Sequence, residues 1–392
     1  MNRRNFILIA GGGVVLAAAG AGAYVYADRT QFTVPNSATS AWSAAATEAG
    51  DIRRQVLSYA ILAPNPHNRQ PWMADLSAPG VIDVSLDTNR LLPATDPYGR
   101  QILMGLGAFL ELASMAAAQK GHRAEIELFP DGAPGEKLDG RRVARVTLAA
   151  EPTAKPDPLF AQVLNRRTDR RPFDPARPVT AAEIAALSEA AKTQPVAFGV
   201  ETQASRLAAI KDIARRAWGQ ELATPETMME SVRLIRIGGP EIDRYRDGIS
   251  ISDPMLVTLS ALGLFDRSKP PAPGSPAMTT QISDFDQITA STPAYLWIVT
   301  EGNERPQQVA AGRAYVRATL AATGHGLSTH PNEQSLQEYP QVAKEYRDIH
   351  KLLTPQGGQT VQMLARLGRS APGLAALAPA PRRGLAALIS KA

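Results

Sequence analysis

The sequence contains no cysteine, and this absence removes several kinds of chemistry together. Disulfides, thiolate nucleophiles, iron–sulfur clusters and cysteine-based zinc sites are all excluded. Only five histidines are present, and they show no metal-ligand spacing. His325 and His330, for example, are five residues apart and would not share one face of a helix. The sequence therefore predicts no metal site.

Familiar catalytic and nucleotide-binding signatures are also missing. The sequence has no Gly-x-Ser-x-Gly elbow, no P-loop and no Rossmann glycine pattern. Gly105 and Gly107 form a lone Gly-x-Gly inside a predicted helix, and Leu110 stands where a third glycine would be needed. No catalytic nucleophile, acid or base is assigned from the sequence.

The charge balance is modest, with 42 basic and 37 acidic residues and a formal net charge of +5. A hydrophobic content of 44% is typical of a soluble protein with a large core. The basic residues cluster at Arg166-Arg167 and Arg170-Arg171 rather than along a stripe. This pattern argues against a nucleic-acid surface and favours a discrete anionic ligand.

The N-terminus, residues 1–27, reads as a targeting segment. Residues 3–7, Arg-Arg-Asn-Phe-Ile, resemble the twin-arginine export signal, and an apolar stretch follows over residues 7–26. Small residues permit cleavage after Ala27, and the alternative is an uncleaved membrane anchor. The expected partner is the twin-arginine translocase, and the expected location is the periplasm or the outer face of the cytoplasmic membrane. That route carries folded proteins, often with the cofactor already inserted.

The rest of the chain divides into a linker over residues 28–50 and two halves, residues 51–160 and 161–392. Each half contains a strand, a turn, a Gly-Arg pair, a long alanine-rich helix and a glycine. In the first half these are strand 81–86, Gly99-Arg100, a helix to 120 and Gly121; in the second they are strand 294–300, Gly312-Arg313, a helix to 323 and Gly324. A degenerate internal duplication is the simplest interpretation, and coincidence between two common strand–helix units is the alternative.

The second half carries a long insertion, about residues 204–288. It contains helical patterns over residues 204–219 and 225–237 and a proline-rich stretch over residues 268–276. An insertion of this kind is often a lid, and the Asp-Gly-Ile turn at residues 247–249 would serve as its hinge.

Two stretches favour ligand binding. Residues 64–72 hold three prolines, which force an extended, turn-rich path, and amides that suit reading the edge of a flat heteroaromatic ring. The alternative is a structural turn capped by a buried tryptophan. Arg166, Thr168 and Arg170 alternate, so in an extended strand all three point to one side, where guanidinium groups and a hydroxyl suit a terminal phosphate. The alternative there is a solvated basic turn ending at Pro172.

Both stretches resemble elements of the nitroreductase-fold flavoproteins. Residues 64–72 are similar to the P-S-x-x-N-x-Q-P-W loop that lines the FMN ring, with Asn65 where a serine is usual, and residues 166–173 are similar to the R-x-S-x-[RK]-x-F element that holds the FMN phosphate. Residues 326–331 resemble the stretch whose backbone amides reach flavin N5, and the terminal Pro-Arg-Arg resembles the closing basic segment. The order of these parts resembles the duplicated, single-chain Acg-like branch.

The resemblance implies an α+β nitroreductase-like fold with two pseudo-symmetric halves, a lid insertion in the second half, and one FMN site. As a pseudo-dimer within one chain, the protein is expected to be monomeric. Arg170 would lie near the ribityl chain and the N1–O2 edge, and Arg383 is favoured over Arg382 at the phosphate. The implied FMN-binding residues are Pro64, Asn65, Pro66, His67, Asn68, Gln70, Arg166, Arg167, Thr168, Arg170, His330, Pro331 and Arg383.

Two functions remain open at this stage. One is an FMN-dependent oxidoreductase of the nitroreductase type that transfers hydride to a small acceptor from an unknown donor. The other is a protein that binds or sequesters FMN with little or no turnover. Steady-state turnover distinguishes the two, and the colour of the purified protein distinguishes both from a basic module without a cofactor.

The export signal yields a direct prediction. Replacing Arg3 and Arg4 together with lysine is expected to leave the protein in the cytoplasm, because the twin-arginine pair is the part of the signal that the translocase reads. Cell fractionation and immunoblotting measure the outcome. Unchanged export would show that the segment uses another route or acts as a simple anchor.

Overall fold

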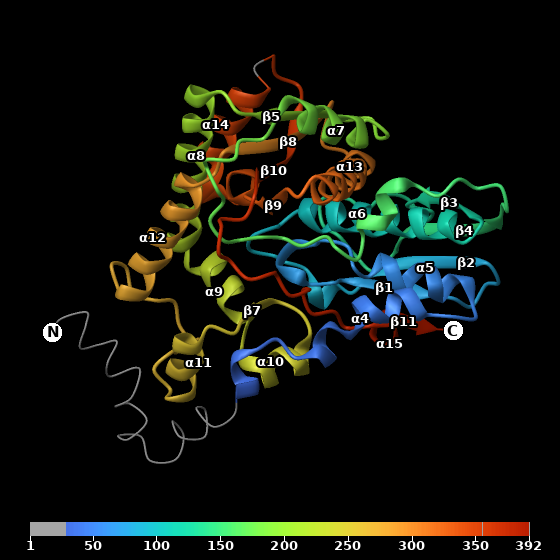
Figure 1. Cartoon of the computed structure of the whole chain (residues 1–392), viewed down its shortest axis with the longest axis horizontal. Coiled ribbons are helices and arrows are strands. Elements are labelled where there is room, and N and C mark those ends of the chain that lie inside the picture. Colours follow the sequence, from blue (N-terminus) through green and yellow to red (C-terminus); the bar gives the residue numbers. More distant parts are fainter. Residues whose placement is uncertain (1–28, 355, 392) are drawn as a thin grey trace.

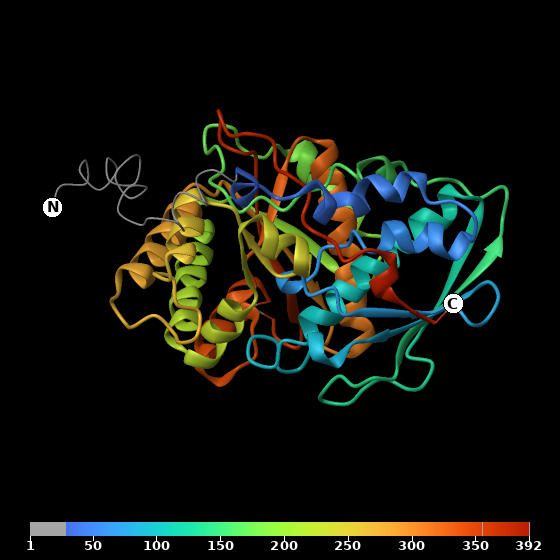
Figure 2. The same cartoon turned by 90° about the horizontal axis from the view of Figure 1, so that it is seen from below.

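The computed structural model describes residues 29–354 and 356–391, and Figures 1 and 2 show their arrangement. The predicted export signal lies outside the described residues. Two sheets lie on either side of a central pair of long helices, α6 and α13 (Figure 1). The predicted α+β architecture is therefore confirmed.

The first sheet has five strands in the order β11-β1-β2-β4-β3. Adjacent strands are antiparallel except β11, which runs parallel to β1. Alternating apolar residues direct one face of β2 into the core, as the sequence pattern predicted. The elements of this half are α5 (Ile52–Ala60), β1 (Trp72–Asp75), β2 (Val81–Leu86), α6 (Arg100–Gln119), β3 (His122–Leu128) and β4 (Arg142–Ala150).

The second sheet has four antiparallel strands in the order β5-β8-β10-β9. Its strand β8 is apolar throughout because helices and strands bury it on both faces. The elements of this half are α7 (Ala181–Ala191), β5 (Ala197–Glu201), β8 (Ala294–Thr300), α13 (Arg305–Gly324), β9 (Ser328–Pro331), α14 (Ala343–Leu353) and β10 (Thr360–Gly368).

The two halves share one connectivity. Each runs helix, two antiparallel strands, a 20-residue helix and two further strands, and the last strand enters beside the second. The predicted start of the second long helix at Gly312 is wrong, because α13 begins at Arg305. A capping box between Glu304 and Gln307, with Pro306 in the first turn, starts the helix there. Arg305 therefore corresponds to Arg100.

Two predicted boundaries need correction. Residues 28–50, interpreted as a linker, contain η2 (Arg29–Phe32) and α4 (Asn36–Thr47). In α4 the buried residues Ala38, Ala41, Trp42 and Ala45 follow helical spacing and pack on the first half. The chain end also leaves the second half: α15 (Leu385–Leu388) and β11 (Ile389–Lys391) cover the open edge of β1.

The insertion lies between β5 and β8, at the opposite end of the molecule from β11 (Figure 2). The predicted helix over residues 225–237 ends earlier, at Arg233, because Ile235 and Ile237 pair with β7. The elements of the insertion are α8 (Ala204–Ala223), α9 (Pro225–Arg233), β6 (Ile235–Ile237), α10 (Gly238–Tyr245), β7 (Ile249–Ile251), α11 (Pro254–Ala261) and α12 (Pro276–Ala290).

Helices α6 and α13 approach each other closely at two glycines. A Cβ atom on Gly107 would overlap the carbonyl oxygen of Val309, and one on Gly312 would overlap the carbonyl oxygen of Met104. Each glycine is the seventh residue after the first residue of its helix, so the contact is nearly symmetric. The main chains touch directly, with no room for a side chain between them.

Charged groups cross the same interface. Glu111 of α6 accepts hydrogen bonds from Arg313 Nε at 2.7 Å and from an Arg317 terminal nitrogen at 2.8 Å. Arg100, at the start of α6, donates to the Leu336 carbonyl at 2.9 Å, and Arg305, at the start of α13, donates to the Tyr98 carbonyl at 2.6 Å. Each helix therefore begins with an arginine that reaches into the other half.

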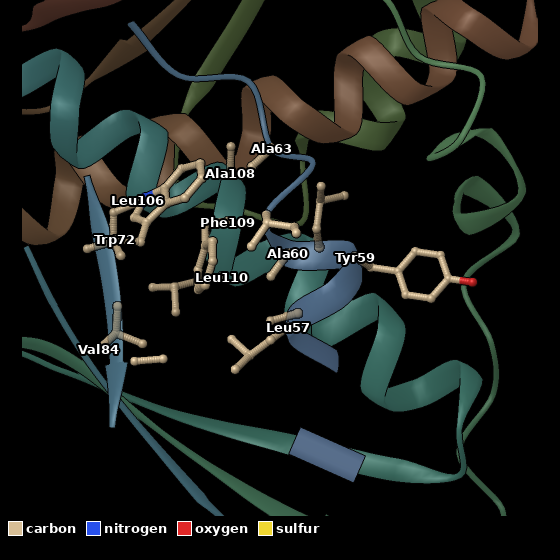
Figure 3. Close-up of a cluster of buried hydrophobic side chains, with 14 of the residues drawn as sticks. Leu57, Tyr59, Ala60, Ala63, Trp72, Val84, Leu106, Ala108, Phe109 and Leu110 are labelled. Carbon is tan, nitrogen blue, oxygen red and sulfur yellow. The ribbon is translucent and has the colours of Figure 1, made fainter. Parts of the chain in front are cut away.

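The largest cluster of buried side chains lies beneath β1 and β2 (Figure 3). Trp72 and Phe109 pack there with ring centroids 4.8 Å apart, and Leu57 of α5 borders the same cluster. Trp72 is 1% exposed. Trp72, the last residue of the 64–72 stretch, is thus a core residue, and its burial fixes the point where the loop joins strand β1.

The glycine contact yields a stability prediction. Replacing Gly107 or Gly312 with alanine is expected to lower the free energy of unfolding by about 3 kcal/mol, the upper end for overpacked cores, because the methyl group meets main chain. Chemical denaturation measures the change.

Gly219 of α8 is the matched control, since nothing lies within 4 Å of a Cβ placed there. Its replacement by alanine is expected to raise the stability by about 0.5–1 kcal/mol through helix propensity. Similar losses at all three positions would contradict the close-contact interpretation.

Candidate functional site

The loop between α5 and β1 is strained. His67, Asn68 and Gln70 have φ angles of 46°, 50° and 48°. These are three of the five non-glycine residues with positive φ among the described residues. Each such residue costs of order 1–3 kcal/mol unless the surroundings impose it, and such residues gather at functional sites. This loop is therefore the first candidate for a binding element.

The loop amides hold the loop itself. Asn65 Oδ1 accepts a hydrogen bond from the Gln70 backbone amide at 2.8 Å, and Gln70 Nε2 donates to the Arg246 carbonyl at 2.8 Å. Asn68 Nδ2 donates to the Pro381 carbonyl at 3.0 Å. The expectation that these side-chain amides are free to read a ring edge is not supported, because their hydrogen-bonding groups are engaged within the protein.

Asp247 of the insertion anchors the same loop. Its carboxylate is 3% exposed and pairs with Arg69 at 3.4 Å, Arg90 at 2.9 Å and Arg236 at 2.9 Å. Arg236 belongs to β6 of the insertion itself, so the ion pairs of Asp247 with Arg69 and Arg90 are those that join the insertion to the first half. The segment predicted to act as a hinge, residues 247–249, thus begins at a residue held by buried ion pairs, and its motion stays a prediction.

The basic stretch lies across the interface from this loop. Thr168 forms a parallel bridge with Thr329 of β9, and the Asp169 amide donates to the Thr329 carbonyl at 3.1 Å. The segment is thus extended, as the alternation of its residues requires. The Asp169 side chain turns away from the ligand-facing residues and accepts hydrogen bonds from Arg171 at 2.8 Å and Ser370 at 2.6 Å.

Arg166 is buried without a counter-charge among the described residues. One terminal nitrogen reaches the Leu62 carbonyl at 3.4 Å, and the side chain takes part in no ion pair there. Burial lowers the pKa of Arg166 to about 10, helped by the charge of Arg167. A buried guanidinium in this state is costly, and an anion would remove most of that cost.

Arg382 shares this environment. It is 3% exposed and donates to the carbonyls of Ile61 at 2.7 Å and Leu62 at 3.0 Å. Burial lowers its pKa to about 9, and repulsion from Arg166 and Arg167 adds to the shift. The structure therefore places Arg382 beside Arg166. The sequence analysis favoured Arg383 instead, since the positions of two adjacent arginines in a sequence do not show which of them turns inward.

Arg383 and Arg167 have other surroundings. The Arg383 amide donates to Gln70 Oε1 at 2.9 Å, and its side chain makes only long contacts of 3.4 Å. Arg167 stacks over the Trp42 ring, 4.7 Å from its centroid, and donates to the Leu164 carbonyl at 2.8 Å. Both residues lie next in sequence to the buried pair Arg166 and Arg382, and the charge of Arg167 adds to the positive potential there.

Arg170 has solvent-exposed surface, yet burial lowers its pKa. A side chain set deep between the two halves, with its tip in water, would account for both the exposed surface and the lowered pKa of Arg170. Among the described residues it forms no hydrogen bond or ion pair. Its charge acts on His67 of the first half and on His330 of the second. Arg170 is thus a free cation flanked by one histidine from each half.

Both flanking histidines are neutral near pH 7. Burial, then Arg170 and Arg69, lowers the pKa of His67 to about 4, and burial lowers the pKa of His330 well below its ordinary value. A terminal nitrogen of Arg366 donates to His330 Nδ1 at 2.9 Å, so the His330 proton resides on Nε2. His67 Nδ1 is buried and has no partner among the described residues. The pair thus offers polar atoms to a ligand.

A cavity of about 590 Å³ lies elsewhere, between residues 91–94 and α9. Arg69 lines it, but no residue of the 166–170 stretch does. Glu230 closes one side, accepting hydrogen bonds from the amides of Ala94 at 2.9 Å and Thr95 at 3.0 Å. The cavity has mostly apolar walls, so the arginine cluster remains the better anion site.

Comparison with known proteins decides the family. Residues 163–369, just over half of the chain, match the model of the Nitroreductase family. The chain belongs to the nitroreductase family. This family match covers the arginine stretch, the insertion, α13 and the sheet of the second half.

Two relatives in Mycobacterium tuberculosis bear the name NAD(P)H nitroreductase. One is 28% identical over 348 residues, which is 86% of this chain and 90% of that protein. The other, Acg, is 35% identical over 125 residues, which is 31% of this chain and 36% of that protein. Among solved structures, the FMN-dependent nitroreductase NfnB from Mycobacterium smegmatis, in complex with NADPH, matches 59% of this chain and 96% of its own, with 16% identity and a TM-score of 0.36.

The neutral state of His67 yields a pH prediction. Its pKa is about 4 in the folded protein against 6.5 as the ordinary value, so the unfolded chain takes up the proton first as the pH falls. The free energy of unfolding is therefore at its full value with respect to His67 above about pH 6.5, and it decreases by about 3 kcal/mol as the pH falls to about 4. His67→Gln is expected to remove that part of the decrease, as measured by denaturant unfolding at several pH values.

His325→Gln is the comparator, because His325 is a solvent-exposed histidine of the same chain. Both variants leave the carboxylates that also titrate in this range unchanged. An identical loss of stability between pH 6.5 and 4 in the wild type and in His67→Gln would contradict a buried, neutral His67.

Proposed function

We propose that this nitroreductase-family protein is an FMN-dependent oxidoreductase that transfers hydride equivalents to a small acceptor. The observation that carries the proposal is the group of cations without counter-charges, Arg166, Arg382 and Arg170. Elsewhere in the described chain, buried arginines either pair with carboxylates, as Arg100 and Arg236 do, or donate to several neutral acceptors, as Arg305 and Arg366 do. The Arg166 side chain, by contrast, makes one long hydrogen bond of 3.4 Å. A phosphate-bearing ligand would supply the anion that is missing beside Arg166 and Arg382.

The residues present fit FMN. Arg166 and Thr168 lie on one extended segment, so a guanidinium group and a hydroxyl can hold a terminal phosphate. Arg382 adds positive charge beside Arg166, while its own guanidinium donates to backbone carbonyls and Asn68. His67 Nδ1 is a buried polar atom without a partner in the described chain, and it lies within the influence of Arg170. His67 and Arg170 come from different halves, so the ring would sit between the halves.

FMN, when bound, supplies reversible acceptance of a hydride. The chain's own residues supply position and charge. Arg170 places a positive charge that stabilises the anionic form of a reduced ring. His330 holds a proton at Nε2, fixed there by Arg366, and can donate it in a hydrogen bond to the ligand. The strained loop holds His67 in place from the other half. No residue is assigned as a nucleophile.

The electron donor in this proposal is inferred from the names of relatives. The name of the M. tuberculosis relatives favours NAD(P)H as the donor. Export by the twin-arginine route, which we also propose, would place the protein where NAD(P)H is scarce. A second function, storage or sequestration of FMN with little turnover, is favoured by the junction at Asp247, because an insertion tied to the first half by Arg69 and Arg90 opens less readily.

We also infer that the shared connectivity of the two halves arose by duplication, with one FMN site per chain. The loop of residues 64–72 belongs to one half and the arginine segment to the other, so together they make one complete site. Residues 51–54 of the first half, Asp-Ile-Arg-Arg, contain no serine or threonine and form the start of α5, where Asp51 caps the helix. A stable monomer is the expected state.

The central prediction concerns flavin content. Arg166→Ala combined with Arg170→Ala is expected to give a folded but colourless protein, because two of the three cations of the proposed site are lost. The apo form of this variant is expected to be at least as stable as the wild-type apo form, since an unpaired buried charge has been removed. Visible absorption, circular dichroism and denaturation of the apo forms measure these outcomes.

Arg141→Ala combined with Arg215→Ala is the matched control, because both side chains form exposed ion pairs far from the site in the sequence. This control is expected to keep one FMN per chain. Full flavin content in the Arg166/Arg170 variant would refute the assignment, and two FMN per chain in the wild type would refute the single site.

A further inference from the structure

The insertion exposes an unusual amount of apolar surface at α11 and the turn after it. We call residues 255–265 the α11 patch. Of its large apolar residues, Val257 is buried, while Met255 is 56% exposed and Leu264 is 69% exposed. The others keep part of their surface accessible, namely Leu256, Leu259, Leu262 and Phe265. Isolated exposed apolar residues are ordinary, but a run of them marks an interaction surface.

The α11 patch lies where the described chain begins. The 3-10 helix η2, residues 29–32, packs against α10 and α11, and Figure 1 shows these helices at the same end of the molecule. Phe32 packs against the small cluster of Ile237 and Val257, and Phe265 of the patch packs against the same cluster. The start of the described chain and the patch are therefore tied together by shared side-chain contacts.

The sequence before this point is apolar over residues 7–26, which is about the length needed to cross a bilayer. Residues 29–32 form η2, so only residues 27 and 28 separate that run from a helix packed against α11. At about 3.3–3.6 Å per residue, such a connection spans roughly 10 Å at most. A bilayer that holds residues 7–26 would therefore lie within reach of the α11 patch.

We propose that the α11 patch rests on the surface of a lipid bilayer. Asp253 and Asp266 balance Arg267 and Lys269, so residues 253–269 carry no net charge. Attraction to anionic headgroups is thus not the driving force, and burial of apolar side chains is. Met255 and Leu264 would enter the headgroup region to a depth of about 5–10 Å, as interfacial helices do. This inference does not depend on the bound cofactor.

The absence of cysteine makes the proposal easy to test on the full chain. Met255→Cys and Leu264→Cys are each labelled with an environment-sensitive fluorophore, and the labelled protein is mixed with phosphatidylcholine vesicles. Ile282→Cys and Leu374→Cys are the matched controls, because these apolar residues are 39% and 42% exposed outside the patch. Circular dichroism confirms that each labelled variant is folded.

The expected result is a blue shift of emission at positions 255 and 264, quenching there by lipids with brominated chains, and neither effect at positions 282 and 374. The shift should persist at high salt. Equal signals at all four positions, no response at 255 and 264, or loss of the shift in salt would each overturn the proposal. A shift that needs no vesicles and grows with protein concentration would assign the patch to self-association instead.

Discussion

The direct contact between the main chains of α6 and α13 is the constraint on which the rest of the fold depends. Gly107 and Gly312 allow the helices to approach until backbone meets backbone, and Arg100 and Arg305 then reach across in opposite directions. This contact sets the distance between the two sheets. It also fixes how far the loop of residues 64–72 lies from the arginine segment, because each belongs to a different half.

Buried guanidinium groups occur in this molecule in two electrostatic states. Arg100 lies against Glu333 at 3.2 Å, and Arg69 and Arg236 share Asp247. Arg166 and Arg382, equally buried, have carbonyl oxygens and each other's repulsion. Arg305 and Arg366 are buried without a carboxylate as well, but their guanidinium groups donate to several neutral acceptors, as that of Arg382 does. Arg166 makes one long hydrogen bond, so it keeps donors that an external anion could use.

Sequence reasoning described the local conformation of the proposed site better than its contacts. The alternation of Arg166, Thr168 and Arg170 and the prolines of the 64–72 loop are local signals. The first segment is extended at Thr168, and the loop is turn-rich, with a single 3-10 turn at Pro66–Asn68. Local signals do not show what a side chain meets after folding. The amides of Asn65 and Gln70 bind the protein itself, and Arg382 rather than Arg383 turns inward, because contacts with residues distant in sequence decide both. The same reason explains the unforeseen return of β11 to β1.

The loop conformation follows from restraints applied from three directions. The C-terminal segment holds Asn68 through Pro381 and Arg382, the insertion holds Gln70 through Arg246, and Trp72 is fixed in the core. A left-handed His67 between such fixed points cannot relax without breaking one of them. Its ring is thereby held within the electrostatic influence of Arg170, and Nδ1 has no partner among the described residues, a state that the free energy of the isolated loop would not favour. The strain is thus a cost of presenting that nitrogen, and the restraints make the presentation permanent in the folded protein.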